Sequence, residues 1–140
     1  MKNIHVSAAV IFRTTDEGTK EVFATARGYG DYKGWWEFPG GKIEHDESGN
    51  EIETAEEALI REIHEELDSK IKVHEKIQTV EWDYPKFHLK MECFRCELVE
   101  GKLTLLEAED AKWLNADNLK TVKWLPADEL ILDKVNALFN

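Results

Sequence analysis

The 140-residue chain contains only two cysteines and three prolines, and it has no excess of basic residues. Its formal net charge is −11 at pH 7. This charge argues against long nucleic acid as a partner, because proteins that bind nucleic acid gain affinity largely from Lys and Arg contacts with phosphate. A small nucleotide that arrives with a divalent cation is not excluded in this way.

The chain also lacks long hydrophobic runs. No apolar segment approaches the roughly 20 residues that a membrane-spanning helix needs. The N-terminal segment Met1-Lys2-Asn3-Ile4-His5 has no apolar core of the kind found in secretory signal peptides. We therefore expect a cytoplasmic protein with no membrane partner. The length predicts a single domain over residues 1–140.

The two cysteines, Cys93 and Cys96, form one C-x-x-C motif. Zinc binding or redox chemistry would fit such a motif, but no second Cys or Cys/His pair completes a zinc set. The alternating residues around the motif predict a β-strand, in which residues three apart point to opposite faces. We therefore expect both cysteines to have structural roles.

Alternating elements predict a mixed α/β domain. Periodicity and turn residues predict strands at 6–12, 21–27, 35–38, 71–80 and 87–98. A helix is expected to begin at Thr54, because Thr54-Ala55-Glu56-Glu57 has the capping-box pattern. A short helical turn at 115–119 and a closing helix at 128–139 complete the prediction.

The helix after Thr54 carries many carboxylates in the segment Arg61-Glu62-Ile63-His64-Glu65-Glu66. A turn of about 100° per residue places Glu62, Glu65 and Glu66 together beside the apolar stripe. Like-charged pairs three or four residues apart each cost roughly 0.2–0.5 kcal/mol in an isolated helix. A divalent cation bound by oxygen ligands would reverse that repulsion. Acidic helix faces are also commonly just solvated, so the helix alone leaves both interpretations open.

A glycine pair precedes this helix, in Glu37-Phe38-Pro39-Gly40-Gly41-Lys42. Glycines let the backbone turn sharply or approach a ligand closely, and exposed amides can receive phosphate oxygens. Most such pairs are ordinary turns. Beside the acidic helix, however, the pair predicts a site that binds a metal and a phosphate group.

Together these segments resemble the signature of the Nudix hydrolases: Gly, five residues, Glu, seven residues, then Arg-Glu-apolar-any-Glu-Glu-any-Gly-apolar. Glu53 and the segment 61–66 match it in register. The segment 36–44 resembles the MutT-type branch, which removes unwanted nucleoside triphosphates. Arg27 and the closing Trp124-Leu125-Pro126-Ala127-Asp128 extend the resemblance over nearly the whole chain. The resemblance implies the Nudix α/β/α sandwich around a central mixed β-sheet.

The sequence departs from the family pattern at two places. Eleven residues separate Gly41 from Glu53, where the family has five, so we expect a longer loop that contributes to substrate selection. Asp68 stands where the family has glycine, and the polar Ser69 stands where an apolar residue is usual. Because Asp tolerates a left-handed cap less well than Gly, the helix is expected to end differently.

The resemblance implies a catalytic metal, Mg²⁺ with Mn²⁺ as a possible substitute. The metal polarises a phosphate and lowers the pKa of a bound water. Gly41 matches the family glycine whose main-chain carbonyl lies near the metal. Glu107 and Glu109 compete for a further ligand position, and Glu109 is assigned to it while that choice stays open. The remaining ligands implied are Glu62, Glu65 and Glu66.

Two residues receive supporting catalytic roles. Glu53 is a candidate general base or an outer residue of the metal site. Arg61 is predicted to orient the glutamates by pairing with Glu57 or Glu65 at i±4. An ordinary ion pair on the helix surface would also explain Arg61.

Substrate contacts are assigned to Arg27 and Asp128. Arg27 resembles a family residue that meets phosphates, although a surface arginine is an equal alternative. Asp128 matches a position that reads a base edge in MutT-type enzymes, and a carboxylate accepts hydrogen bonds from amino groups. Asp128 is equally suited to be the N-cap of the last helix.

The resulting prediction is an enzyme that cleaves a nucleoside triphosphate into a nucleoside monophosphate and pyrophosphate. Its substrate is expected to be an oxidised guanine nucleotide or a cytidine nucleotide, and the protein a monomer or homodimer. One alternative is a Nudix hydrolase of another nucleoside diphosphate-linked compound. The other is a non-catalytic nucleotide-binding module, which predicts the loss of a signature carboxylate, and none is lost.

Overall fold

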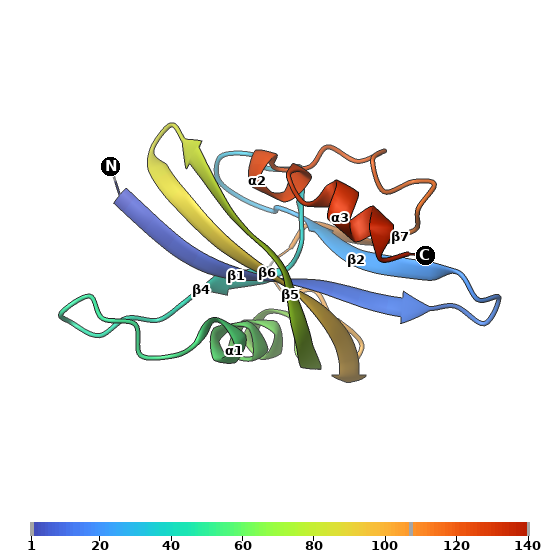
Figure 1. Ribbon diagram of the computed structural model, residues 1–140, viewed down its shortest axis with the longest axis horizontal. Helices are drawn as coiled ribbons and strands as arrows, with labels where there is room; N and C mark the ends of the chain where they lie inside the picture. Colours follow the sequence, from blue (N-terminus) through green and yellow to red (C-terminus); the bar gives the residue numbers. More distant parts are fainter. Residues whose placement is uncertain (1, 107, 140) are drawn as a thin grey trace.

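The computed structural model describes residues 2–106 and 108–139. That part of the chain contains both strands and helices, as expected for an α/β protein, although they come in groups rather than in alternation (Figure 1). The strands are β1 Lys2–Thr14, β2 Lys20–Ala26, β3 Trp36–Glu37, β4 Gly40–Lys42, β5 Lys70–Tyr84, β6 Phe87–Glu100 and β7 Asp110–Leu114. The helices are α1 Ala55–Leu67, α2 Pro126–Glu129 and α3 Leu132–Ala137.

The strands form one sheet in the order β3-β2-β1-β6-β5, with β4 pairing to β1 and β7 pairing to β2. β1 and β6 are parallel, whereas the other paired strands are antiparallel. Helix α1 covers one face of the sheet, and α2 and α3 cover the other (Figure 1). The predicted layered arrangement around a mixed sheet is therefore confirmed.

The central strand β1 contributes to two separate hydrophobic cores. Ala8 and Val10 belong to the core that includes residues of α2 and α3. Ala9 and Ile11 belong to the core beneath α1. This alternation follows from the strand period of two, because neighbouring side chains of β1 point to opposite faces of the sheet.

Cys93 and Cys96 lie in the two different cores, as the strand assignment predicted. Both are buried free cysteines, and burial raises the pKa of each thiol. The structural interpretation of the C-x-x-C motif is thus confirmed.

Helix α1 begins as predicted. The Thr54 hydroxyl accepts a hydrogen bond from the Glu57 amide at 3.1 Å, and the Glu57 carboxylate accepts one from the Thr54 amide at 2.9 Å. The expectation about its end was wrong. Asp68 adopts the left-handed conformation, with φ 48°, and its amide bonds to the His64 carbonyl. The buried Ser69 hydroxyl fixes the chain that follows, so the geometry survives without glycine.

Other boundaries also differ from the prediction. Two short strands, β4 and β7, were not anticipated, because their pairing depends on partners far away in the sequence. The single closing helix predicted at 128–139 is divided into α2 and α3. No helix within residues 2–106 and 108–139 is long and apolar enough to cross a membrane.

Candidate functional site

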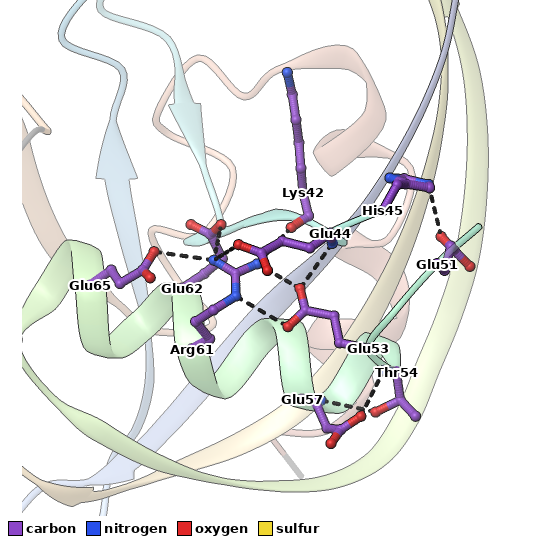
Figure 2. A network of polar contacts seen from close by, with 10 residues as sticks. All are labelled: Lys42, Glu44, His45, Glu51, Glu53, Thr54, Glu57, Arg61, Glu62 and Glu65. Carbon is purple, nitrogen blue, oxygen red and sulfur yellow. Dashed lines mark hydrogen bonds and ion pairs between the residues drawn. The ribbon is translucent and has the colours of Figure 1, made fainter. Parts of the chain in front are cut away.

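Arg61 is the centre of a polar network that joins α1 to the segment before it (Figure 2). Its Nε and Nη2 atoms donate to the two Glu53 oxygens at 3.1 and 2.6 Å. Nη1 donates to Glu62 at 2.9 Å and to Glu65 at 3.1 Å. Nη2 also donates to the Lys42 carbonyl at 3.0 Å. Arg61 therefore holds several glutamates at once, which a simple surface ion pair would not do.

The network also lowers the pKa of Glu53. Hydrogen bonds from Arg61 lower the pKa of the Glu53 carboxyl, and a bond from the Glu44 amide acts in the same direction. Both Glu53 oxygens are thus engaged, one by Nε and the other by Nη2 and the Glu44 amide. Of the two partners predicted for Arg61 at i±4, Glu65 is used, whereas Glu57 serves the helix cap.

Gly41 provides the close approach between β4 and α1. A Cβ atom at this position would lie 2.4 Å from Glu62 Oε2 and 2.3 Å from its carboxyl carbon. Such a contact is too short for any side chain, so glycine is required for Glu62 to lie against the strand. The Glu62 side chain is only 14% exposed.

A cavity of about 940 Å³ runs beside these residues. Its wall includes Gly41, Glu62 and Glu66 at one end and Arg27 and Asp128 at the other. The cavity therefore brings together candidates that lie as much as 101 positions apart in the sequence. Glu65 is not part of this wall, and its side chain is 57% exposed where it meets Arg61.

Aromatic side chains line the cavity between the glycine-rich loop 28–34 and the β5–β6 hairpin. Tyr84 packs edge-on against Tyr32, with ring centroids 5.5 Å apart, and stacks on Phe87 at 5.0 Å. An ion pair between Asp31 and Lys86, 3.3 Å long, links the loop to the hairpin. This wall offers an apolar surface suited to a planar ring.

Arg27 forms a bidentate ion pair with Glu37 in the cavity wall. Its Nε and Nη2 atoms donate to the two carboxylate oxygens at 3.2 and 2.9 Å. Arg27 is therefore not an isolated surface arginine. The sequence did not reveal Glu37 as its partner, because their proximity follows from the pairing of β2 with β3.

Asp128 is buried within α2, and its Oδ2 accepts a hydrogen bond from the Phe38 amide at 2.9 Å. Burial raises the pKa of the Asp128 carboxyl to about 8, and the nearby Glu37 charge adds to this rise. The capping hypothesis was wrong. Leu125 is the N-cap of α2 and Ile131 that of α3, so Asp128 caps neither helix.

The candidates for a further metal ligand lie just before β7. The exposed Glu109 bonds through its amide to the Ala26 carbonyl at 3.0 Å, and its neighbour Ala108 lines the cavity. Glu107 lies outside the described residues. The choice between the two glutamates therefore stays open.

The loop between Gly41 and Glu53, which is six residues longer than in the family pattern, forms a small hairpin closed by a bridge between His45 and Glu51. Asp46 stabilises its turn by accepting hydrogen bonds from the amides of Ser48 and Asn50, each at 2.9 Å. Glu51 also contacts His5 on β1. Figure 1 shows this segment projecting beyond α1, and none of its residues after Lys42 lines the cavity.

No group of three or more His, Cys, Asp or Glu side chains is arranged to hold a metal ion in residues 2–106 and 108–139. Instead, the Arg61 guanidinium lies against Glu62 and Glu65 (Figure 2). The chemistry of the donors still suits a hard cation. Carboxylates from one helix and the adjacent main chain of Gly41 are the oxygen ligands that Mg²⁺ and Mn²⁺ prefer.

Comparison with known proteins identifies the family. The NUDIX domain model matches residues 4–138. The 8-oxo-dGTP diphosphatase of Escherichia coli K12 is 27% identical over 139 residues, which cover 99% of this chain and 100% of that protein. The CTP pyrophosphohydrolase of the same organism is 30% identical over 138 residues, covering 99% and 95% of the two chains.

A solved structure agrees with these relatives. The solution structure of the E. coli ORF135 protein has a TM-score of 0.78 and 28% identity, and the match covers 99% of this chain and 91% of that one. The fold and the family model therefore point the same way. The chain belongs to the Nudix family and is a Nudix hydrolase of the MutT type.

Proposed function

We propose that residues 1–140 form a single Nudix domain that hydrolyses a nucleoside triphosphate to a nucleoside monophosphate and pyrophosphate, with Mg²⁺ as the metal. The observation that carries this proposal is one cavity that joins the acidic face of α1 to Arg27 and the buried Asp128. A nucleotide has the same two-part character, with a charged phosphate chain at one end and a planar base at the other.

At the α1 end, Glu62, Glu65 and Glu66 would hold the cation, together with the main chain of Gly41. When bound, the metal would neutralise phosphate charge and lower the pKa of an attacking water. Arg61 positions Glu62 and Glu65 through its hydrogen bonds. Because Arg61 lowers the pKa of Glu53, its carboxylate is a weak base, and Glu53 acts by orienting Arg61 rather than as the general base.

Towards the other end, Arg27 would meet the phosphate that joins the chain to the nucleoside, and Asp128 would read the base. With a pKa of about 8, the Asp128 carboxyl is mostly protonated at neutral pH. One oxygen accepts from Phe38, which leaves the other to donate a proton toward the cavity. Cytosine and 8-oxoguanine both present adjacent donors and acceptors, and the two E. coli relatives are named for CTP and 8-oxo-dGTP.

A nucleotide panel tests the proposal. The protein is incubated with Mg²⁺ in H₂¹⁸O and with 8-oxo-dGTP, dGTP, CTP, dCTP, a nucleoside diphosphate sugar or ADP-ribose. We expect pyrophosphate and a nucleoside monophosphate from 8-oxo-dGTP or CTP. Release of orthophosphate, or preferred turnover of the diphosphate-linked compounds, would contradict the proposed substrate class. Tight nucleotide binding with no product would indicate a binding module.

Mass spectrometry of the products locates the attack. Label in the nucleoside monophosphate indicates that water attacked the α-phosphorus, and label in pyrophosphate indicates the β-phosphorus. In either case the label shows which phosphorus atom receives the oxygen of water.

A further inference from the structure

Ser7, in the wall of the cavity, has a buried hydroxyl group without a hydrogen-bond partner among the described residues. The residue lies in β1, is 0% exposed, and its Oγ has no hydrogen-bond partner among the described residues. A buried hydroxyl without a partner loses its hydration and gains nothing in return, and folded proteins contain few such groups. The buried Ser69, by contrast, donates to the Leu67 carbonyl at 2.9 Å and accepts from the Leu103 amide at 2.8 Å.

The register of the sheet shows where the Ser7 side chain points. Ala9 and Ile11, on the same strand, pack in the core beneath α1. Side chains two residues apart share a face, so Ser7 also faces α1. Ser7 is paired directly with Gly41 in the antiparallel β1–β4 ladder. Side chains of such a pair lie side by side, with Cβ positions roughly 4.5–5.5 Å apart.

Glu62 lies at this same place. Its Oε2 is 2.4 Å from where a Gly41 Cβ would be, while its Oε1 accepts from Arg61 at 2.9 Å. The carboxylate therefore rests on Gly41, beside the Ser7 side chain. Ser7, Gly41 and Glu62 also line one cavity. An unsatisfied donor thus stands next to the carboxylate that is expected to move from Arg61 toward a metal.

We propose that Ser7 is a positioning residue for Glu62, whose carboxylate accepts a hydrogen bond from the Ser7 hydroxyl when it binds a divalent cation. The inference rests on the metal-dependent hydrolysis proposed above. A carboxylate oxygen has lone pairs for both a cation and a hydrogen-bond donor. Hydrogen bonds from outer residues orient metal ligands and raise metal affinity. A small donor that can rotate is well suited to a carboxylate that changes partners.

The test compares Ser7→Ala with the matched control Ser69→Ala, which also removes a buried serine hydroxyl. Mn²⁺ affinity is measured by the electron paramagnetic resonance signal of the free ion, and thermal unfolding is followed with and without Mn²⁺. Ser7→Ala should weaken Mn²⁺ binding about 10-fold and reduce the rise in Tm that Mn²⁺ produces. Without metal its Tm should be unchanged or higher, because an unsatisfied hydroxyl is lost.

Ser69→Ala should show the reverse pattern, a lower Tm without metal and unchanged Mn²⁺ affinity, because its hydroxyl is satisfied within the fold. Ser7→Thr retains the hydroxyl and should keep Mn²⁺ affinity within about threefold of the wild type. If the wild type binds Mn²⁺ and releases pyrophosphate, and Ser7→Ala binds Mn²⁺ with the same affinity, the role of Ser7 is overturned and the proposed function stays intact. A wild type that neither binds Mn²⁺ nor releases pyrophosphate would overturn both.

Discussion

The two ends of the cavity place carboxyl groups in opposite electrostatic environments. At the α1 end, glutamates are partly exposed and share the single cation of Arg61 (Figure 2). At the α2 end, Asp128 is buried and takes its hydrogen bond from a main-chain amide. The pKa of a carboxyl group is therefore lowered beside Arg61, at Glu53, and raised at the α2 end, at Asp128.

The difference has a simple physical cause. A nearby cation favours the charged form of a carboxyl group, whereas burial disfavours it. Arg61 lowers the pKa of Glu53, and burial raises that of Asp128 to about 8. A group of glutamates beside one arginine suits a metal and phosphates, and a buried carboxyl group with a raised pKa suits a base that must be read by hydrogen bonds. The predictions below alter one end at a time.

The largest effect is expected from Glu65→Gln at the α1 end. This change removes the charge of a carboxylate that we propose as a metal ligand, and it weakens the contact with Arg61. Because outer residues of metal sites alone contribute 10–100-fold, loss of a ligand should reduce kcat by about 100-fold or more. The matched control is Glu56→Gln, an exposed glutamate in the first turn of the same helix. Near-normal turnover of Glu65→Gln would show that this ligand is wrongly assigned.

Arg61→Lys should have the next largest effect. Lysine keeps the positive charge but cannot form the two-pronged contact with Glu53 while also reaching Glu62 and Glu65. We expect kcat to fall about 10-fold or more, with no change in nucleotide preference, because Asp128, which we propose to read the base, is untouched. Steady-state kinetics on the preferred nucleotide and on its closest competitor measure both quantities. A change in preference would mean that the two ends do not act independently.

Asp128→Asn tests the other end through pH. The folded protein holds a proton on Asp128 up to about pH 8, whereas an unfolded Asp loses it near pH 3.9. The folded state therefore binds more protons across this window, so the free energy of unfolding falls as pH rises through it. Asparagine stays neutral and can still accept from Phe38. Its Tm should exceed that of the wild type by on the order of 5 °C at pH 8.

The control for this prediction is Asp133→Asn, since Asp133 is 91% exposed and pairs only with Lys120 among the described residues. Its unfolding profile should follow that of the wild type between pH 5 and 8. Asp128→Asn should also change the ratio of kcat/KM values for 8-oxo-dGTP and CTP. Identical pH profiles for Asp128→Asn and the wild type would show that Asp128 is ionised in the folded protein.

Much of the α1 end could be predicted from the sequence, because most of its residues lie close together along the chain. Helical periodicity alone groups Glu62, Glu65 and Glu66, and the capping box at Thr54 correctly sets where α1 begins. The interpretation of Arg61 needed only helix spacing and was confirmed in its contact with Glu65. Its bonds to Glu53 and Lys42 required knowledge of how the preceding loop returns to the helix.

The α2 end was harder to predict from the sequence, because its contacts join residues that lie far apart along the chain. Asp128 appeared able to cap a helix, yet its partner is the amide of Phe38, 90 residues earlier. At the α1 end, the pairing of Ser7 with Gly41 also depends on sheet register, which no short motif specifies. Residues whose roles arise from contacts between segments far apart in the sequence were therefore the ones that sequence reasoning missed or misassigned.

The smallest effect is expected at Asp68, which ends α1 and lines neither end of the cavity. Its φ of 48° is a conformation that glycine adopts without strain. Asp68→Gly should therefore raise the free energy of unfolding by up to about 1 kcal/mol, as measured by denaturant titration. Mn²⁺ affinity and kcat/KM should stay unchanged, because Ser69 continues to anchor the chain beyond the helix. A loss of stability would show that the Asp68 side chain itself stabilises the left-handed turn and has taken over the role of the family glycine.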